Sequence, residues 1–133
     1  MSSRYERDSV AASWYFASGQ PVAPMRQEIR QYFSNFAVDG SLNAIEVIVG
    51  ELLANVVRHA NSSATIHVAW QDDAPTLTVV DSGPGYTAAA IPMPAFEDDS
   101  GYGLWLVQSL GDDVRITRGP RGGTTVSVRL PYD

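Results

Sequence analysis

The run Glu51-Leu-Leu-Ala-Asn55 places a carboxylate and a carboxamide inside a long apolar stretch. Apolar residues recur around this run at helical spacing and fall within about 100° of arc on one side of a helix. These residues are Leu42, Ile45, Val49, Leu52 and Val56. Glu51, Asn55 and Arg58 stack on another side, because positions i, i+4 and i+7 of a helix lie above one another. The pattern predicts a helix over 42–59 with a polar column beside its core face. The three polar residues are equally compatible with an ordinary solvent-exposed face that has no function.

A second motif, Asp81-Ser-Gly83-Pro-Gly85, follows a strand-like run. Side chains alternate along a strand, so Leu77, Val79 and Asp81 share one face and the carboxylate reaches the apolar side. A buried carboxylate needs donors, and the exocyclic amine of adenine is a donor that would distinguish adenine from guanine. Gly83 and Gly85 leave room for a flat ring against the backbone. By itself the motif is also compatible with a plain Asp-Ser-Gly turn.

A third motif, Gly101-Tyr-Gly103, precedes a short apolar helix expected over 103–110. The first N–H groups of a helix are unpaired, and the helix dipole favours anions there, so these glycines suit a phosphate as well as a simple loop and cap. Residues 83–100, with the acidic run Glu97-Asp-Asp99, form the one long irregular stretch. A loop of that length is typical of a lid or binding loop.

The rest of the chain reads as one helix and five strands around these motifs. A buried stripe of Met25, Ile29, Tyr32, Phe33 and Phe36 predicts a helix over 22–36, and Ser41 is the expected N-cap of the next helix. Period-2 alternation and turn residues predict the strands. They are expected over 11–20, 64–70, 76–80, 114–118 and 124–130, with a turn at 71–75.

Composition bounds the chain to a single domain. It has 133 residues, 44% of them hydrophobic, and no cysteine, so thiolate chemistry and disulfides are excluded. The net charge is −6 and all nine basic residues are arginines, which argues against a nucleic-acid surface. A polyphosphate would have to be held by a divalent ion, backbone N–H groups, a helix N-terminus or arginine, because no lysine is present.

We expect a cytoplasmic protein without a membrane segment, since the N-terminal residues are charged and no apolar run reaches about 20 residues. Residues 1–10 are interpreted as an N-terminal extension, with disorder left open, and residues 11–133 as the domain.

The three motifs, together with Gly123-Thr124, resemble the N, G1, G2 and terminal Gly-Thr boxes of the GHKL (Bergerat-fold) ATP-binding domains in order and rough spacing. The run from Glu51 to Ala60 is most similar to that of the anti-sigma factor serine/threonine kinases. The likeness covers about residues 11–131. It implies an α+β fold, a two-layer α/β sandwich in which helices cover one face of a mixed, mostly antiparallel sheet.

The resemblance also implies roles for single residues. Asn55 would coordinate the Mg²⁺ that bridges the phosphates of ATP, and Asp81 would bind the adenine amine. Glu51 matches the family's catalytic base, which activates the incoming serine hydroxyl. The acidic run 97–99 departs from the family pattern, in which many relatives carry an arginine beside the second glycine pair.

Further nucleotide-binding residues implied by the resemblance lie on the glycine motifs and on the last strand. They are Gly83, Gly85, Tyr86, Gly101, Tyr102, Gly103, Leu104, Thr124 and Thr125. Residues 86–100 would form the ATP lid. Thr124 shares a strand face with Val126 and Val128, which favours it over Thr125 as the threonine that reaches toward Asp81.

Three functions are compatible with the resemblance. The first is a protein serine kinase that phosphorylates an anti-anti-sigma (STAS-type) antagonist and sequesters a sigma factor, with a homodimer as one assembly left open. The second is a regulator that binds ATP or ADP to set its affinity for a partner without phosphotransfer. The third is a detached histidine-kinase catalytic domain, ranked last because the sequence shows no dimerising helix hairpin with a phosphoacceptor histidine.

Overall fold

The computed structural model describes residues 10–36, 39–60, 62–72, 74–83, 102–118 and 122–131, with the backbone alone described for 39, 40, 59, 60, 102 and 103. Its elements follow one another in the order β1 (Val10–Phe16), α2 (Val22–Phe33), α3 (Asp39–Asn55), the π-helix η1 (Val56–Ala60), β2 (Ala64–Gln71), β3 (Ala74–Asp81), α4 (Tyr102–Leu110), β4 (Asp112–Arg118) and β5 (Thr124–Arg129).

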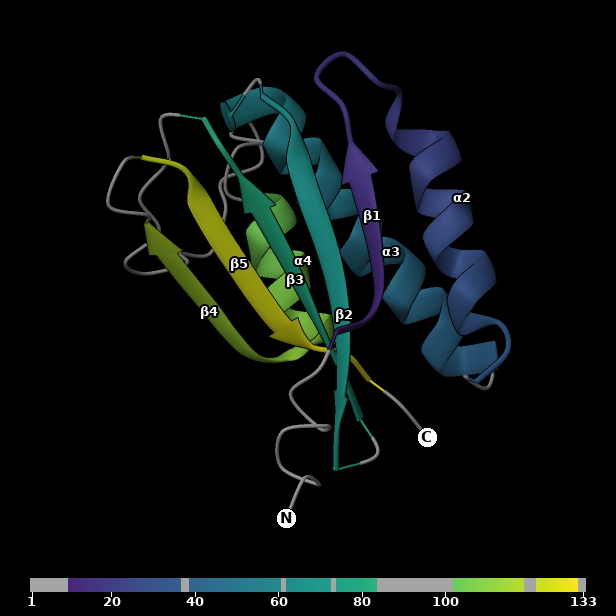
Figure 1. The fold of residues 1–133 in the computed structure, drawn as a ribbon. Helices are drawn as coiled ribbons and strands as arrows, with labels where there is room; N and C mark the ends of the chain where they lie inside the picture. The colour runs from purple at the N-terminus through teal and green to yellow at the C-terminus, as the bar shows by residue number, and fades with distance from the viewer. Residues whose placement is uncertain are drawn as a thin grey trace.

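The five strands form one sheet in the order β1-β2-β3-β5-β4. Every pair of neighbouring strands is antiparallel. The sheet described here is therefore wholly antiparallel, whereas a mixed, mostly antiparallel sheet was expected. The helices lie against one face of the sheet, with α2 and α3 over its β1 side and α4 over its β4 side (Figure 1). This two-layer α+β arrangement confirms the predicted fold class.

The core lies between the two layers, where the apolar faces of helices and strands meet. On α3 the predicted face is confirmed, because Leu42, Ile45, Val49, Leu52 and Val56 are all buried. On β3, Leu77 and Val79 are buried in the same core, and Asp81 is the last buried residue on that face of the strand. The period-3.6 and period-2 patterns of the sequence therefore assign core residues correctly on both kinds of element.

The first strand and first helix are shorter than predicted. β1 ends at Phe16 because a turn follows, in which Gln20 N donates to the carbonyl of Ala17 and Ala17 N donates to the Gln20 side chain. α2 ends at Phe33, so Phe36 lies beyond the helix and is 47% exposed, contrary to its predicted place in the core. Tyr32 is only half-buried.

The boundaries of α3 and β3 also differ from prediction. Helix α3 begins at Asp39, so Ser41 lies inside it and is not an N-cap, and past Asn55 the backbone continues as the π-helix η1. Strand β3 begins at Ala74, inside the predicted turn, and Pro75 pairs with Trp70 near the strand start. Proline is compatible with that place because its missing N–H matters least near the first residue of a strand.

Helices α2 and α3 are joined by polar contacts as well as by the core. The guanidinium of Arg30 donates to Glu46 at 2.8 Å, and Arg26 lies 3.7 Å from the same carboxylate. These contacts turn the arginines of α2 toward α3. The opposite, outer side of α2 consequently carries the acidic and amide side chains, Glu28 among them.

Candidate nucleotide site

Asp81 ends β3 as a buried carboxylate, 5% exposed. Its Oδ1 accepts hydrogen bonds from the backbone N–H groups of Gly83, at 3.0 Å, and Thr124, at 3.2 Å. The Thr124 contact follows from the sheet, because Asp81 and Thr124 are register partners on β3 and β5. Both donors engage the same oxygen, so the carboxylate is fixed in orientation by one oxygen while neither donor uses Oδ2.

The backbones of two glycine segments meet beside Asp81. The N–H of Gly123 donates to the carbonyl of Gly83, and Gly122 lies close to the same carbonyl. A Cβ built on Gly123 would stand 2.5 Å from the carbonyl oxygen of Asp81, closer than real Cβ atoms come. Gly123 also has a φ of +81°, which glycine adopts readily. These close backbone approaches hold the end of β3 against the start of β5.

We expect Gly123→Ala to lower the free energy of unfolding by about 2 kcal/mol or more, because the added methyl meets backbone that cannot rotate away. Gly19→Ala is the matched control, since Gly19 has a φ of +84° with no atom within 4 Å of an added Cβ. The control isolates the strain of a positive φ, about 1 kcal/mol. Urea unfolding of both variants measures the difference, and equal losses would contradict the close approach.

Asn55 is fully buried at the junction of α3 and η1. Its Oδ1 accepts a hydrogen bond from Nη2 of Arg58 at 3.3 Å, while its Nδ2 is buried with no hydrogen-bond partner. A buried amide donor without an acceptor is unfavourable and uncommon in native structures. The arrangement fits a group that supplies acceptor atoms next to Asn55, as a phosphate would.

The π-helix changes the predicted polar column. Glu51 lies one turn before Asn55 on α3 and is half-buried, and Arg58 is exposed within η1. A π-helix widens the turn, and such turns are frequent at functional sites. It brings Arg58 to Asn55 as a direct hydrogen-bond partner.

The parts of the chain that hold Asn55 and Asp81 lie at one end of the molecule. Asp81 pairs with Ala64, the first residue of β2, and β2 follows η1 after a short connection. Ser82 N also donates to the hydroxyl of Ser62 in that connection, at 3.2 Å. Figure 1 shows the end of α3, the end of β3 and the start of β5 at the same end of the sheet.

The other predicted binding residues have different placements. Leu104 is buried in the first turns of α4, with Tyr102 and Gly103 as the first residues of that helix. Thr124 is buried with Val126 and Val128, whereas Thr125 pairs with Val80 on the opposite face of the sheet from Asp81. Gly85, Tyr86, Gly101 and the predicted lid at 86–100 lie outside the described residues.

Sequence reasoning missed two contributors to this site. The close approach of Gly122 and Gly123 to Gly83 depends on pairing of distant strands, and the Gly-Gly pair just before β5 was its one sequence signal. The Arg58 contact to Asn55 depends on the π-helix η1, which the periodicity of apolar residues in the sequence does not predict.

The described residues hold no cluster of three or more His, Cys, Asp or Glu side chains that could bind a metal. A magnesium ion at this site would therefore be held by Asn55 together with phosphate oxygens and water. Magnesium in nucleotide sites ordinarily takes few protein ligands, so this donor set fits it.

The fold is a two-layer α+β domain in which the buried polar residues Asn55 and Asp81 lie toward one end of the sheet. The sequence pattern of the family described as "Histidine kinase-like ATPase domain" matches residues 17–130, and the chain belongs to that family. Family membership implies that ATP is the nucleotide bound.

The similar proteins include histidine kinases. The chain is 27% identical over 104 residues to the signal transduction histidine-protein kinase AfsQ2 of Streptomyces coelicolor, covering 67% of this chain and 19% of that protein. Two structures of the blue-light activated histidine kinase of Erythrobacter litoralis EL346 share its fold. For its histidine kinase domain the TM-score is 0.54 at 20% identity, covering 96% of this chain and 69% of that chain; for the other structure the values are 0.52, 22%, 85% and 42%.

Within the residues that the structure describes, none of the helices combines the length and apolarity needed to cross a bilayer.

Proposed function

We propose that this protein binds magnesium ATP between α3, the β3–β5 end of the sheet and the start of α4, and transfers the terminal phosphoryl group to a serine of a STAS-type antagonist. A sigma factor is the second partner in this proposal. The observation that carries nucleotide binding is the fixed, buried carboxylate of Asp81 beside the Gly83–Gly123 backbone contact. Family membership supports ATP and kinase-like chemistry, and the resemblance of residues 51–60 supports serine as the acceptor.

Each end of the nucleotide would meet a different kind of group. The second carboxylate oxygen of Asp81 would accept from the adenine amine, with no side chain at Gly83 to obstruct a flat ring. Asn55 would hold the magnesium ion through its side-chain oxygen, which accepts a hydrogen bond from Arg58 in this structure. When bound, the ion supplies charge neutralisation at the phosphates. Backbone N–H groups at the start of α4 would meet the phosphates at a favourable helix dipole.

Glu51 is the proposed base, one turn before Asn55 and half-buried. It would accept the proton of the serine hydroxyl as that oxygen bonds to the terminal phosphorus, while the bond from that phosphorus to the bridging oxygen breaks and ADP leaves. We expect Glu51→Gln to slow phosphoryl transfer about a hundredfold while leaving ATP affinity within about threefold, because Gln keeps the shape. Asp72→Asn, at an exposed carboxylate in the β2–β3 turn, is the control. A Glu51→Gln variant that transfers at the wild-type rate would contradict this role.

A histidine acceptor is the second candidate, and one observation favours it, namely that the named relatives are histidine kinases. The chain covers 19% of the AfsQ2 length, so the activity of the whole relative is not carried over. A third candidate is a nucleotide-dependent binding protein without transfer. It is favoured by the acidic run 97–99, which comes shortly before Gly101 in the sequence, because acidic groups near a polyphosphate would repel it.

One labelling experiment separates the three. The protein is incubated with magnesium ATP labelled at the terminal phosphate, together with a STAS-domain antagonist or with a histidine-kinase phosphoacceptor domain. Label that appears on the antagonist and survives acid supports phosphoserine and the proposed function. Acid-labile, base-stable label on the phosphoacceptor domain would replace it with histidine transfer. If ATP binds and no protein becomes labelled, the third candidate, a regulator that binds ATP without phosphoryl transfer, is supported instead.

A further inference from the structure

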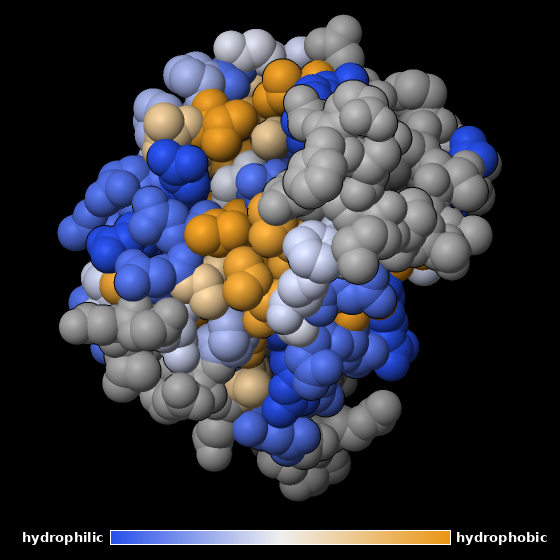
Figure 2. Space-filling view, turned by 180° about the vertical axis from the view of Figure 1, so that it is seen from behind, coloured by the Kyte–Doolittle hydropathy of each residue, from blue (hydrophilic) through white to orange (hydrophobic). Residues whose placement is uncertain are grey.

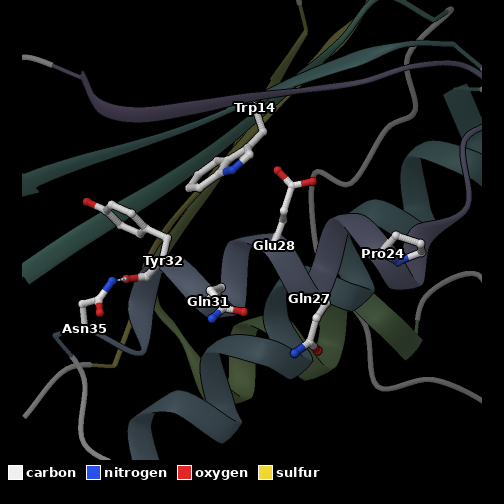
Figure 3. A pocket seen from close by; sticks show the side chains of 7 residues that line it. All are labelled: Trp14, Pro24, Gln27, Glu28, Gln31, Tyr32 and Asn35. Atoms are coloured by element: carbon white, nitrogen blue, oxygen red, sulfur yellow. Dashed lines mark hydrogen bonds between the residues drawn. The ribbon is translucent and has the colours of Figure 1, made fainter.

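A hollow lies away from the nucleotide site, between the edge strand β1 and the outer side of α2. Its volume is about 580 Å³, and Trp14 forms its wall on β1. The α2 side supplies residues that are mostly acidic or amide: Pro24, Gln27, Glu28, Gln31, Tyr32 and, just past the helix, Asn35. Figure 3 shows the Trp14 ring and the Glu28 carboxylate both directed into the space between strand and helix.

Two aromatic rings and one carboxylate give this hollow its chemistry. The rings of Trp14 and Tyr32 meet edge to face, with centroids 5.5 Å apart and planes at 79°. Tyr32 is itself held in place, because its hydroxyl accepts a hydrogen bond from the indole N–H of Trp70 at 2.9 Å. Glu28 makes no ion pair with another described residue. Aromatic faces attract cations, and a carboxylate beside them adds a charged acceptor.

The charge distribution on α2 favours a cationic occupant. The two arginines of the helix, Arg26 and Arg30, face Glu46 on α3, and none of the lining residues is basic. The hollow therefore presents one negative charge and three side-chain amides whose carbonyl oxygens can accept hydrogen bonds. The net charge of −6 attracts a basic partner at longer range.

We propose that this hollow binds an arginine side chain of a partner polypeptide. A guanidinium is planar, stacks on aromatic rings and donates two parallel hydrogen bonds to a carboxylate, which a lysine ammonium cannot do. A polypeptide fits better than a free small molecule, because Phe36 extends the apolar surface beyond the hollow. Phe36 is 47% exposed and its ring lies 5.2 Å from that of Tyr32. It is placed to contact the residues that flank the arginine.

The test uses capped Gly-Arg-Gly peptide and follows the indole N–H signals of the three tryptophans by NMR. We expect the Trp14 signal to shift in a saturable way while the Trp105 signal stays unchanged. Capped Gly-citrulline-Gly, which has the same size without the charge, is expected to give no saturable shift, and the lysine peptide to bind at least about threefold more weakly. Equal binding of the citrulline or lysine peptide would overturn the assignment.

The variant Glu28→Gln tests whether the carboxylate of Glu28 binds the guanidinium group. Glu28 is exposed and Gln keeps its helix propensity, so the variant is expected to fold and to bind the arginine peptide about tenfold more weakly. Asp72→Asn is the matched control, an exposed carboxylate in the β2–β3 turn at a φ of 54°, which Asn accepts. Unchanged peptide affinity in Glu28→Gln would overturn the proposal. Both variants should keep wild-type ATP affinity, so the experiment tests the arginine site independently of the nucleotide site.

Discussion

Asn55→Ala is expected to abolish magnesium-dependent nucleotide binding, with an affinity loss of about a thousandfold. Asn55 is fully buried and its amide Nδ2 lacks a partner, so its side chain is positioned for a ligand and not for the fold. Loss of one member of a buried charged contact costs about 4 kcal/mol, the equivalent of that factor. Calorimetric titration with ATP, in magnesium and in excess EDTA, measures the effect.

Asn43→Ala is the matched control, because Asn43 is an exposed asparagine on the same helix. We expect it to bind magnesium ATP as the wild type does. In Asn55→Ala the fold should persist, with the free energy of unfolding changed by about 1 kcal/mol or less, since the deletion also removes a buried unpaired donor. Undiminished magnesium-dependent affinity in a folded Asn55→Ala variant would refute the metal assignment.

Asp81→Asn is expected to remove the preference for adenine. A site that hydrogen-bonds a particular group of its ligand commonly rejects the analogue that lacks the group by several orders of magnitude. We therefore expect the ratio of ATP to GTP affinity to fall by about a thousandfold. The Asn side chain keeps an acceptor oxygen where Oδ1 now receives the N–H groups of Gly83 and Thr124, so the strand ends should stay joined.

Competition of ATP and GTP for a fluorescent adenine nucleotide measures that ratio. Asp112→Asn is the control, an exposed aspartate at the start of β4 whose own contact is to the next backbone N–H. It should leave the ratio unchanged. If Asp81→Asn discriminates between the two nucleotides as well as the wild type does, the base-binding role of this carboxylate is wrong.

Much of the fold was predictable because burial repeats at a fixed period in the sequence. The face of α3 that begins at Leu42 and the alternation that ends at Asp81 gave both the core and the side of the sheet that the helices cover. The prediction that Phe36 lies in the core was wrong, because the helix ends at Phe33 and helical periodicity does not apply beyond that residue. Boundaries depend on turn hydrogen bonds such as that between Gln20 and Ala17, which a period cannot reveal.

The candidate site divides in a similar way. Strand alternation placed Asp81 and Thr124 on the core face, and the structure shows both buried. Asn55 was expected in a polar column beside the core face of α3, and the structure shows it fully buried. The structure alone shows that Gly83 and Thr124 donate to one oxygen of Asp81, because those donors come from segments 41 residues apart in the chain. It alone shows that Arg58 binds the Asn55 oxygen, through a π-helical turn.

By itself the sequence determined the class of fold, the core faces and the residue types available to hold a polyphosphate, since these follow from local periodicity and composition. The tertiary structure decided which backbone groups meet Asp81, the orphaned amide of Asn55 and the hollow of Trp14 and Glu28. The physical reason is that such contacts join residues far apart in the chain. Strand register and helix packing set their geometry, and neither is encoded at any single position.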